Sequence, residues 1–88
     1  MNKIIFIDTE TGGVNPEKAA LIQLSGIIRI DKKDVEKFNF YIKPFENSEV
    51  TEKALEVQGR TLEDLKTDKY VEEKEVYKQF INLLDKYI

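Results

Sequence analysis

The stretch Phe6-Ile7-Asp8-Thr9-Glu10-Thr11-Gly12-Gly13 decides how this 88-residue chain is interpreted. The apolar run Ile4–Ile7 leads into it and favours a central strand that is covered on both faces. In an extended chain the side chains of Asp8 and Glu10 leave the same face, with Cα atoms about 6–7 Å apart. That separation suits carboxylate oxygens that share a hard divalent cation. Acidic residues after a strand also form turns or cap helices, so Asp-x-Glu alone leaves both roles open.

The glycines give the octapeptide a second property. Gly12 and Gly13 belong to a loop predicted over Thr9–Glu17, and a residue without Cβ lets a ligand approach the backbone closely. An apolar strand that ends in acids and then glycines is typical of a metal-and-phosphate site. The same glycines equally serve only to shape the turn.

Two further strands follow from the pattern of apolar residues. A second strand is predicted over Leu21–Ile30, with Gly26 marking a bulge or a close approach of two backbones. A polar turn over Asp31–Asp34 joins it to a third strand over Val35–Lys43, which Pro44 ends. This arrangement predicts an antiparallel hairpin.

The pattern turns helical from Thr51, which can cap a helix over Glu52–Val57. Gly59 suits the left-handed residue that closes such a turn, and Thr61–Asp64 resembles a capping box with Asp in place of Glu. The last helix carries an apolar stripe typical of core packing. Its residues are Val76, Phe80, Leu83 and Tyr87, widened by Tyr77 and Leu84.

Composition is that of a globular protein, with 41% apolar and 35% charged residues. Met1-Asn2-Lys3 lacks the apolar core of a signal peptide, and no apolar run approaches the roughly 20 residues that span a membrane. The absence of Cys excludes disulfides and fits a cytoplasmic protein. The net charge is −3, and Lys32–Lys33 and Lys66–Lys69 are interpreted as solvated turns. This scatter of basic residues argues against a metal-free nucleic-acid-binding module.

The octapeptide resembles the first motif of the DnaQ-like (DEDD) 3′–5′ exonucleases, a family that includes the proofreading subunit (epsilon) of bacterial DNA polymerase III and RNA-trimming relatives. Weaker likenesses continue along the chain but cover only the front half of a family domain. They are Ala20–Gly26 as second strand, Phe40–Pro44 as third strand, Val57–Gly59 in place of a common Val-His-Gly, and Tyr70–Ile88 as the next helix.

The resemblance implies a partial ribonuclease-H-like α/β fold, a three-stranded, mostly antiparallel sheet followed by helices. Residues 1–88 would form a single domain, the N-terminal portion of an exonuclease domain. Asp8 and Glu10 would be its catalytic, metal-binding carboxylates, in a site that holds two Mg²⁺ or Mn²⁺ ions when complete. Thr11, Gly12 and Gly13 would contact the terminal nucleotide of a single-stranded DNA or RNA 3′ end.

The sequence departs from the family in what it lacks. The family's other two carboxylates and its His or Tyr base belong to a second and a third motif, and neither motif is present here. Two carboxylates neutralise half of the charge of two divalent cations, so we expect at most one weakly held ion.

Three other residues are lesser candidates, each with two interpretations. Gln23 is a solvated strand residue or a partner of a metal ligand. Gln58 stands in place of the family's frequent His, as a loop residue or as a contact to the terminal nucleotide. Phe45 packs under its loop or stacks on a base.

Three functions therefore compete. The first is a 3′–5′ exonuclease-family protein, incomplete and inactive as this chain alone. The second is a non-catalytic remnant that acts as an interaction module, and the third is a small acidic metal- or nucleotide-binding protein. A family strand that would flank Ile4–Ile7 is expected to follow Ile88, so we expect an exposed apolar sheet edge. That edge predicts a homo-oligomer or pairing with a missing C-terminal half, with no membrane partner.

Overall fold

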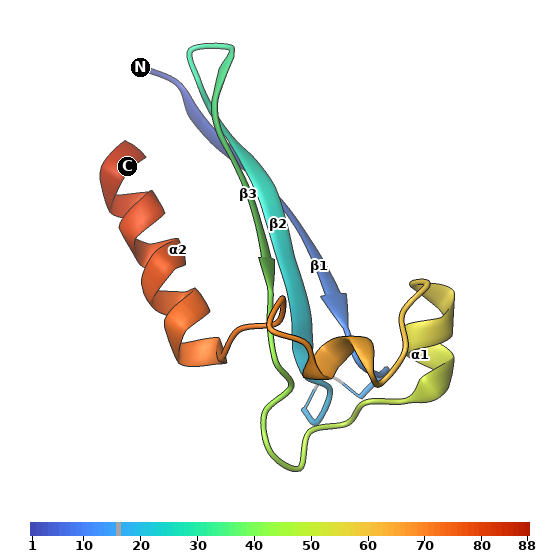
Figure 1. The fold of residues 1–88 in the computed structure, drawn as a ribbon. Coiled ribbons are helices and arrows are strands. Elements are labelled where there is room, and N and C mark those ends of the chain that lie inside the picture. Colours follow the sequence, from blue (N-terminus) through green and yellow to red (C-terminus); the bar gives the residue numbers. More distant parts are fainter. Residues whose placement is uncertain (16) are drawn as a thin grey trace.

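The computed structural model describes residues 1–15 and 17–88; Pro16, within the predicted Thr9–Glu17 loop, lies outside them. The described residues form one antiparallel sheet with helices after it (Figure 1). This confirms the predicted α/β class. Among the described residues, no helix has the length and apolar character that crossing a bilayer requires. The elements are β1 (Lys3–Thr11), β2 (Leu21–Ile30), β3 (Lys33–Tyr41), α1 (Glu52–Val57), the 3-10 helix η1 (Asp64–Lys66) and α2 (Glu73–Tyr87).

The connection between β2 and β3 is tighter than the predicted turn over Asp31–Asp34. Asp31 and Lys32 have φ values of 49° and 71°. Positive φ at both central residues defines a type I′ turn, whose twist matches that of the two strands it joins. β3 therefore begins at Lys33, two residues earlier than predicted.

β1 is an edge strand with exposed side chains, so the prediction of a central strand covered on both faces is wrong. The strand order is β1-β2-β3, and among the described residues β1 pairs only with β2. Ile4, Phe6 and Ile7 are 39%, 46% and 53% exposed. The reason is that a strand becomes central only when a second strand pairs with it, and the described residues supply none. The expected exposed apolar edge is confirmed.

One face of the sheet carries the apolar side chains that the alternation in β2 predicted. Ile22 on this face is fully buried. Helix α2 lies alongside β3 (Figure 1), and the ring centroid of Phe80 is 5.5 Å from that of Phe38 on the same face. Val76 of the predicted stripe is buried, whereas Tyr77 is 66% exposed and does not widen it. A step of about 100° along the helix carries Tyr77 away from the sheet once Val76 faces inward.

The segment between β3 and α2, residues 42–72, packs over the end of the sheet at which β1 ends (Figure 1). Its helices contribute to a buried cluster that also includes the start of β2. The cluster consists of Ala20, Ile22, Leu55, Leu65 and Tyr70.

A side-chain cap begins α1, and a reciprocal pair of hydrogen bonds closes the turn that leads into η1, both from residues that the sequence indicated. Thr51 Oγ1 accepts a hydrogen bond from the Ala54 N–H at 3.2 Å, and Gly59 has a φ of 71°. The Thr61 N–H donates to Asp64 Oδ2 at 2.8 Å, and the Asp64 N–H donates to Thr61 Oγ1 at 3.3 Å. The capping box therefore forms with Asp in the place of the usual Glu.

Candidate functional site

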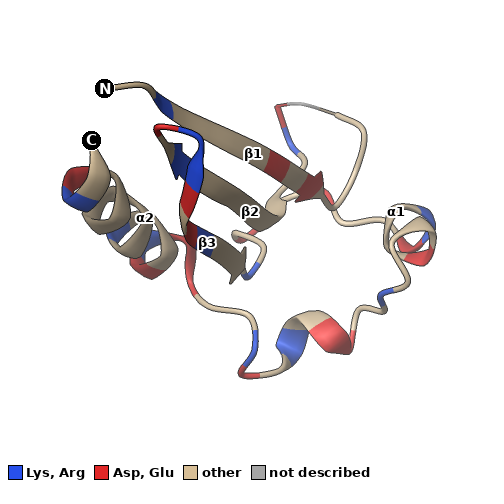
Figure 2. Ribbon diagram, turned by 90° about the horizontal axis from the view of Figure 1, so that it is seen from above, with Lys and Arg blue, Asp and Glu red and all other residues tan. Residues whose placement is uncertain are grey.

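Asp8 and Glu10 lie near the carboxyl end of β1, the acidic segment of that strand in Figure 2. Asp8 is opposite Ser25 and Glu10 is opposite Gln23 across the β1–β2 pair, and the register shifts after Glu10. Cross-strand partners share a face and successive residues alternate. Both carboxylates therefore leave the same face, opposite to the face that α2 contacts. Asp8 is exposed and Glu10 is half-buried.

A hollow of about 440 Å³ opens beside Asp8 on this face. Its wall combines the apolar side chains of Phe6 and Ile27 with the polar side chains of Lys37 and Asn39. Glu10 is not among the lining residues. The size lies within the range of small-ligand sites. The hollow thus brings together one carboxylate, one ammonium group and an apolar wall.

The carboxylate pair has no third metal-binding side chain beside it among the described residues. The described residues contain no group of three or more His, Cys, Asp or Glu side chains placed to hold a metal ion. Magnesium is commonly held by one or two carboxylates, with waters and substrate phosphate as the other ligands. Asp8 and Glu10 supply two carboxylates on one face, and a metal ion held between them stays a prediction. A second ion would need carboxylates from outside the described residues.

The glycine turn after β1 packs closely against another part of the chain. The Gly12 N–H donates to the Ala20 carbonyl at 2.9 Å, and the Gly12 carbonyl accepts from the Thr51 N–H at 2.8 Å. Both glycines are buried, and a Cβ on Gly13 would collide with the side chain of Glu49. The absence of Cβ thus serves close packing here, and contact with a terminal nucleotide stays a prediction.

The two glutamines have other partners than the carboxylates. Gln58 Nε2 donates to the Thr11 carbonyl at 2.8 Å, while its buried Oε1 has no hydrogen-bond partner among the described residues. Gln23 donates to Asn39 Oδ1 at 2.8 Å and accepts from the guanidinium of Arg60. Gln23 is therefore part of a polar network on the face that carries the carboxylates.

A basic and aromatic cluster at the end of this network was missed by sequence reasoning. Tyr41 is opposite Gln23, and its ring centroid lies 4.1 Å from Lys69 Nζ and 5.6 Å from Arg60 Cζ. Asn39 donates to the Tyr41 hydroxyl at 3.2 Å and thereby lowers the pKa of Tyr41. Burial opposes this effect, and the charges of Lys69 and Arg60 lower the pKa further. Lys69 was interpreted as part of a solvated turn because no local pattern links it to a distant strand.

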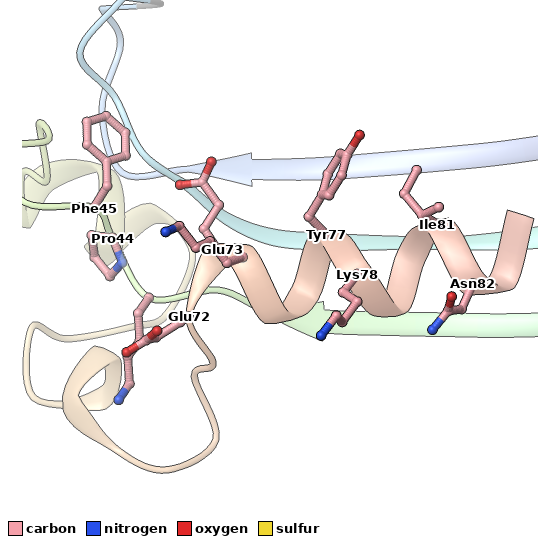
Figure 3. A pocket seen from close by; sticks show the side chains of 10 residues that line it. Pro44, Phe45, Glu72, Glu73, Tyr77, Lys78, Ile81 and Asn82 are labelled. Carbon is pink, nitrogen blue, oxygen red and sulfur yellow. The ribbon is translucent and has the colours of Figure 1, made fainter.

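A larger groove of about 1010 Å³ lies between the start of α2 and the segment after β3 (Figure 3). Phe45, Tyr77 and Ile81 contribute its apolar lining. Phe45 is 45% exposed, so the interpretation that it packs under its loop is wrong. It faces this groove instead, because no described segment covers it. The groove shares no lining residue with the hollow beside Asp8.

Comparisons with known proteins agree on one family. A family model described as Exonuclease matches residues 5–87. Ribonuclease T from Haemophilus ducreyi is 33% identical to this chain over 60 residues. The match covers 62% of this chain and 28% of the relative, so the chain spans less than a third of that relative's length.

Proposed function

Because the chain belongs to the exonuclease family, we propose that it takes part in metal-dependent hydrolysis at nucleic-acid 3′ ends. The three-stranded antiparallel sheet followed by helices is consistent with a partial ribonuclease-H-like fold. Residues 1–88 would act as one domain, the N-terminal portion of an exonuclease domain resembling the epsilon subunit of DNA polymerase III. The observation that supports this best is the placement of Asp8 and Glu10 on one open face, with a hollow of small-ligand size beside Asp8. The disulfide-free composition is compatible with the cytoplasm, the compartment we propose.

In this proposal Asp8 and Glu10 hold one Mg²⁺ or Mn²⁺ ion through carboxylate oxygens. The chemistry that such an ion supplies is polarisation of a phosphodiester oxygen and neutralisation of developing negative charge. Lys37, across the hollow from Asp8, would orient the phosphate. Thr11, Gly12 and Gly13 would support the terminal nucleotide from the turn. The chain alone is inactive, because a second metal and a general base worth roughly 10²–10⁴-fold in rate need further residues.

Calorimetric titration with Mn²⁺ tests the metal proposal directly. We expect a single weak site in the wild type and none in Asp8→Asn or Glu10→Gln. Asp85→Asn, an exposed acid on α2, is the matched control and should bind like the wild type. Two tight sites, or unchanged binding in Asp8→Asn, would contradict this assignment.

A 3′-labelled oligonucleotide assay in Mn²⁺ tests the activity. We expect no release of label above that of Asp8→Ala, which controls for contaminating nuclease. Release by the wild type at a rate that Asp8→Ala abolishes would show that this chain is active alone. That result would retain the exonuclease assignment and reject the incompleteness.

The open edge of β1 is where we propose a partner binds. The Asp31 N–H donates to the Asn2 carbonyl at 2.8 Å. Hydrogen-bonded positions alternate along an antiparallel pair, so the even-numbered residues that follow Asn2 in β1 bond to β2. The odd-numbered residues of β1 therefore direct their N–H and C=O groups away from β2. Such an edge with exposed Phe6 and Ile7 is a template for a second copy of the chain or a missing C-terminal half.

Light scattering distinguishes these arrangements. We expect the wild type to self-associate, and Ile7→Lys to shift it to the monomer because a lysine at an edge opposes strand pairing. Val57→Lys replaces an equally apolar exposed side chain on α1 and should leave the association unchanged. A clean wild-type monomer at high concentration would remove the homo-oligomer and leave the C-terminal half as the partner.

A second candidate function is a non-catalytic interaction module that uses the same edge. The exposure of Ile4, Phe6 and Ile7 favours it. Metal binding distinguishes the two candidates, because an interaction module has no need of the carboxylate pair. Association through β1 together with no Mn²⁺ binding would select the module over the nuclease.

A further inference from the structure

A cleft of about 420 Å³ separates the end of the sheet from the segment between α1 and α2. Tyr41, Gln58, Arg60 and Lys69 contribute to its wall. Two of these residues carry a positive charge and approach the same ring, that of Tyr41, within 4.1 and 5.6 Å of its centroid. The ring attracts each cation, and the two cations repel each other.

Neither cation has an acidic partner among the described residues. The ion pairs found there are Arg29–Asp34 and Lys66–Glu63. Asp64 also lines the cleft, but its carboxylate accepts from the Thr61 N–H in the capping box. The cleft therefore holds two cations against one carboxylate, which already bonds a backbone N–H, in a protein whose net charge is −3. An anion that entered the cleft would relieve the repulsion between the two cations.

The guanidinium of Arg60 is held in place before any ligand arrives. Its Nη1 donates to the Tyr70 hydroxyl at 3.1 Å, and its Nη2 donates to Gln23 Oε1. The Arg60 N–H donates to the carbonyl of Leu55, and both Tyr70 and Leu55 are buried. An anchored side chain loses little conformational entropy on binding. Arg60 thus has the fixed geometry of a phosphate-binding residue.

The cleft lies in line with the carboxylates. Glu10 is opposite Gln23, and Gln23 is opposite Tyr41, so the three residues form one row across the sheet. Two strand spacings separate Glu10 from Tyr41, which is about 10 Å. Each strand of B-form DNA advances roughly 3.4 Å per nucleotide along the helix axis, so this span corresponds to about three nucleotides of a single strand that keeps that stacking.

From this geometry we propose that Arg60, Lys69 and Tyr41 form a subsite for a backbone phosphate of single-stranded nucleic acid, about three nucleotides from the end held at Asp8 and Glu10. The subsite rests on the proposed function for its ligand, but it needs no metal. Arg60 and Lys69 bind phosphate oxygens, and Tyr41 keeps the two cations together through its ring.

The test is fluorescence anisotropy with a 5′-labelled oligodeoxyadenylate of eight nucleotides, whose bases stack, at low salt and with EDTA. Lys69→Gln and Arg60→Gln are each expected to weaken binding about tenfold and to reduce the slope of log K against log salt by about 0.7. Lys33→Gln, the matched control at the opposite end of the sheet, should bind like the wild type. Arg60 also bonds Tyr70, so thermal unfolding of both variants accompanies the assay, and Lys69, which is exposed, gives the cleaner comparison.

The outcomes separate the subsite from the metal site. Equal losses in all three variants would show diffuse attraction and overturn the subsite, as would wild-type affinity in Lys69→Gln. Either result could occur while Mn²⁺ still binds at Asp8, which would leave the proposed function intact. Conversely, a selective loss in the two cleft variants supports the subsite even if Mn²⁺ binding fails.

Discussion

Replacing Gly26 by alanine tests how the spacing between β1 and β2 positions the site. Gly26 lies opposite Ile7 in β1 and opposite Phe38 in β3. A Cβ there would collide with the carbonyl oxygen of Phe6 and would lie 2.6 Å from Phe38 Cζ. The Phe38 ring is buried and packs against Phe80, so it has little room to turn away. The edge strand β1 must therefore move.

The size of the expected effect follows from the type of clash. Overpacking costs about 1–3 kcal/mol, and a clash with a backbone atom belongs at the upper end. Alanine regains about 0.4–1 kcal/mol by restricting the unfolded chain. The net loss is about 2 kcal/mol, which for a domain of this size lowers the melting temperature by about 8–16 °C. Because Asp8 follows Ile7 directly, we also expect weaker Mn²⁺ binding.

Circular dichroism melts and Mn²⁺ calorimetry measure the two effects in one variant. Gly59 provides the controls, since it has open space around it but a φ of 71°. Gly59→Ala should lose about 1–2 kcal/mol through backbone strain and keep its metal affinity, and Gly59→Asn should be nearly neutral. A Gly26→Ala protein as stable as the wild type would refute the reasoning, because the strand spacing would then not depend on glycine.

Three further predictions concern stability. Thr51→Ala removes the cap of α1 and should cost about 1 kcal/mol, a fall in melting temperature of about 4–8 °C, whereas Thr51→Ser should retain the cap. Leu55→Ala, at a side chain 1% exposed, should cost about 2–5 kcal/mol in urea unfolding. The hydrogen bond from Arg29 lowers the pKa of Asp34, so its stabilisation is present above the unfolded pKa of about 3.9 and is lost as pH falls through the folded pKa. NMR titration should show that lowered pKa in the wild type and its return towards the usual value in Arg29→Gln.

The elements with local signals were predictable from the sequence. The bounds of β2 and the helix over Glu52–Val57 match the prediction. These elements depend on local patterns: the alternation of side chains in a strand, the cap at Thr51 and the left-handed conformation at Gly59. Each pattern involves residues close together in the chain, so it can be recognised in a single sequence. Gly26 also belongs here, since the predicted close approach of backbones is what the structure displays.

The features that depend on distant residues were not predictable in the same way. An apolar run such as Ile4–Ile7 indicates burial, but a second neighbouring strand and the layers packed over the faces of the sheet decide whether burial occurs, and the described residues lack that strand. The residues around Lys69 in the sequence indicate a solvated lysine. Its contact with the ring of Tyr41 forms only when the chain folds. Tyr77 differs from its buried neighbour only in the rotation of α2, which packing against β3 sets.

The placement of Gln23 explains how opposite charges can work side by side on this face. Gln23 stands between Glu10 and Tyr41 in the row across the sheet, and it accepts from Arg60. A carboxylate at this position would form an ion pair with Arg60 and remove its charge from the cleft. A neutral amide satisfies the guanidinium and leaves its charge uncompensated. Glu10 then stays available to a cation, and Arg60 stays available to a phosphate. A single strand of nucleic acid that crosses this face would use both residues at once.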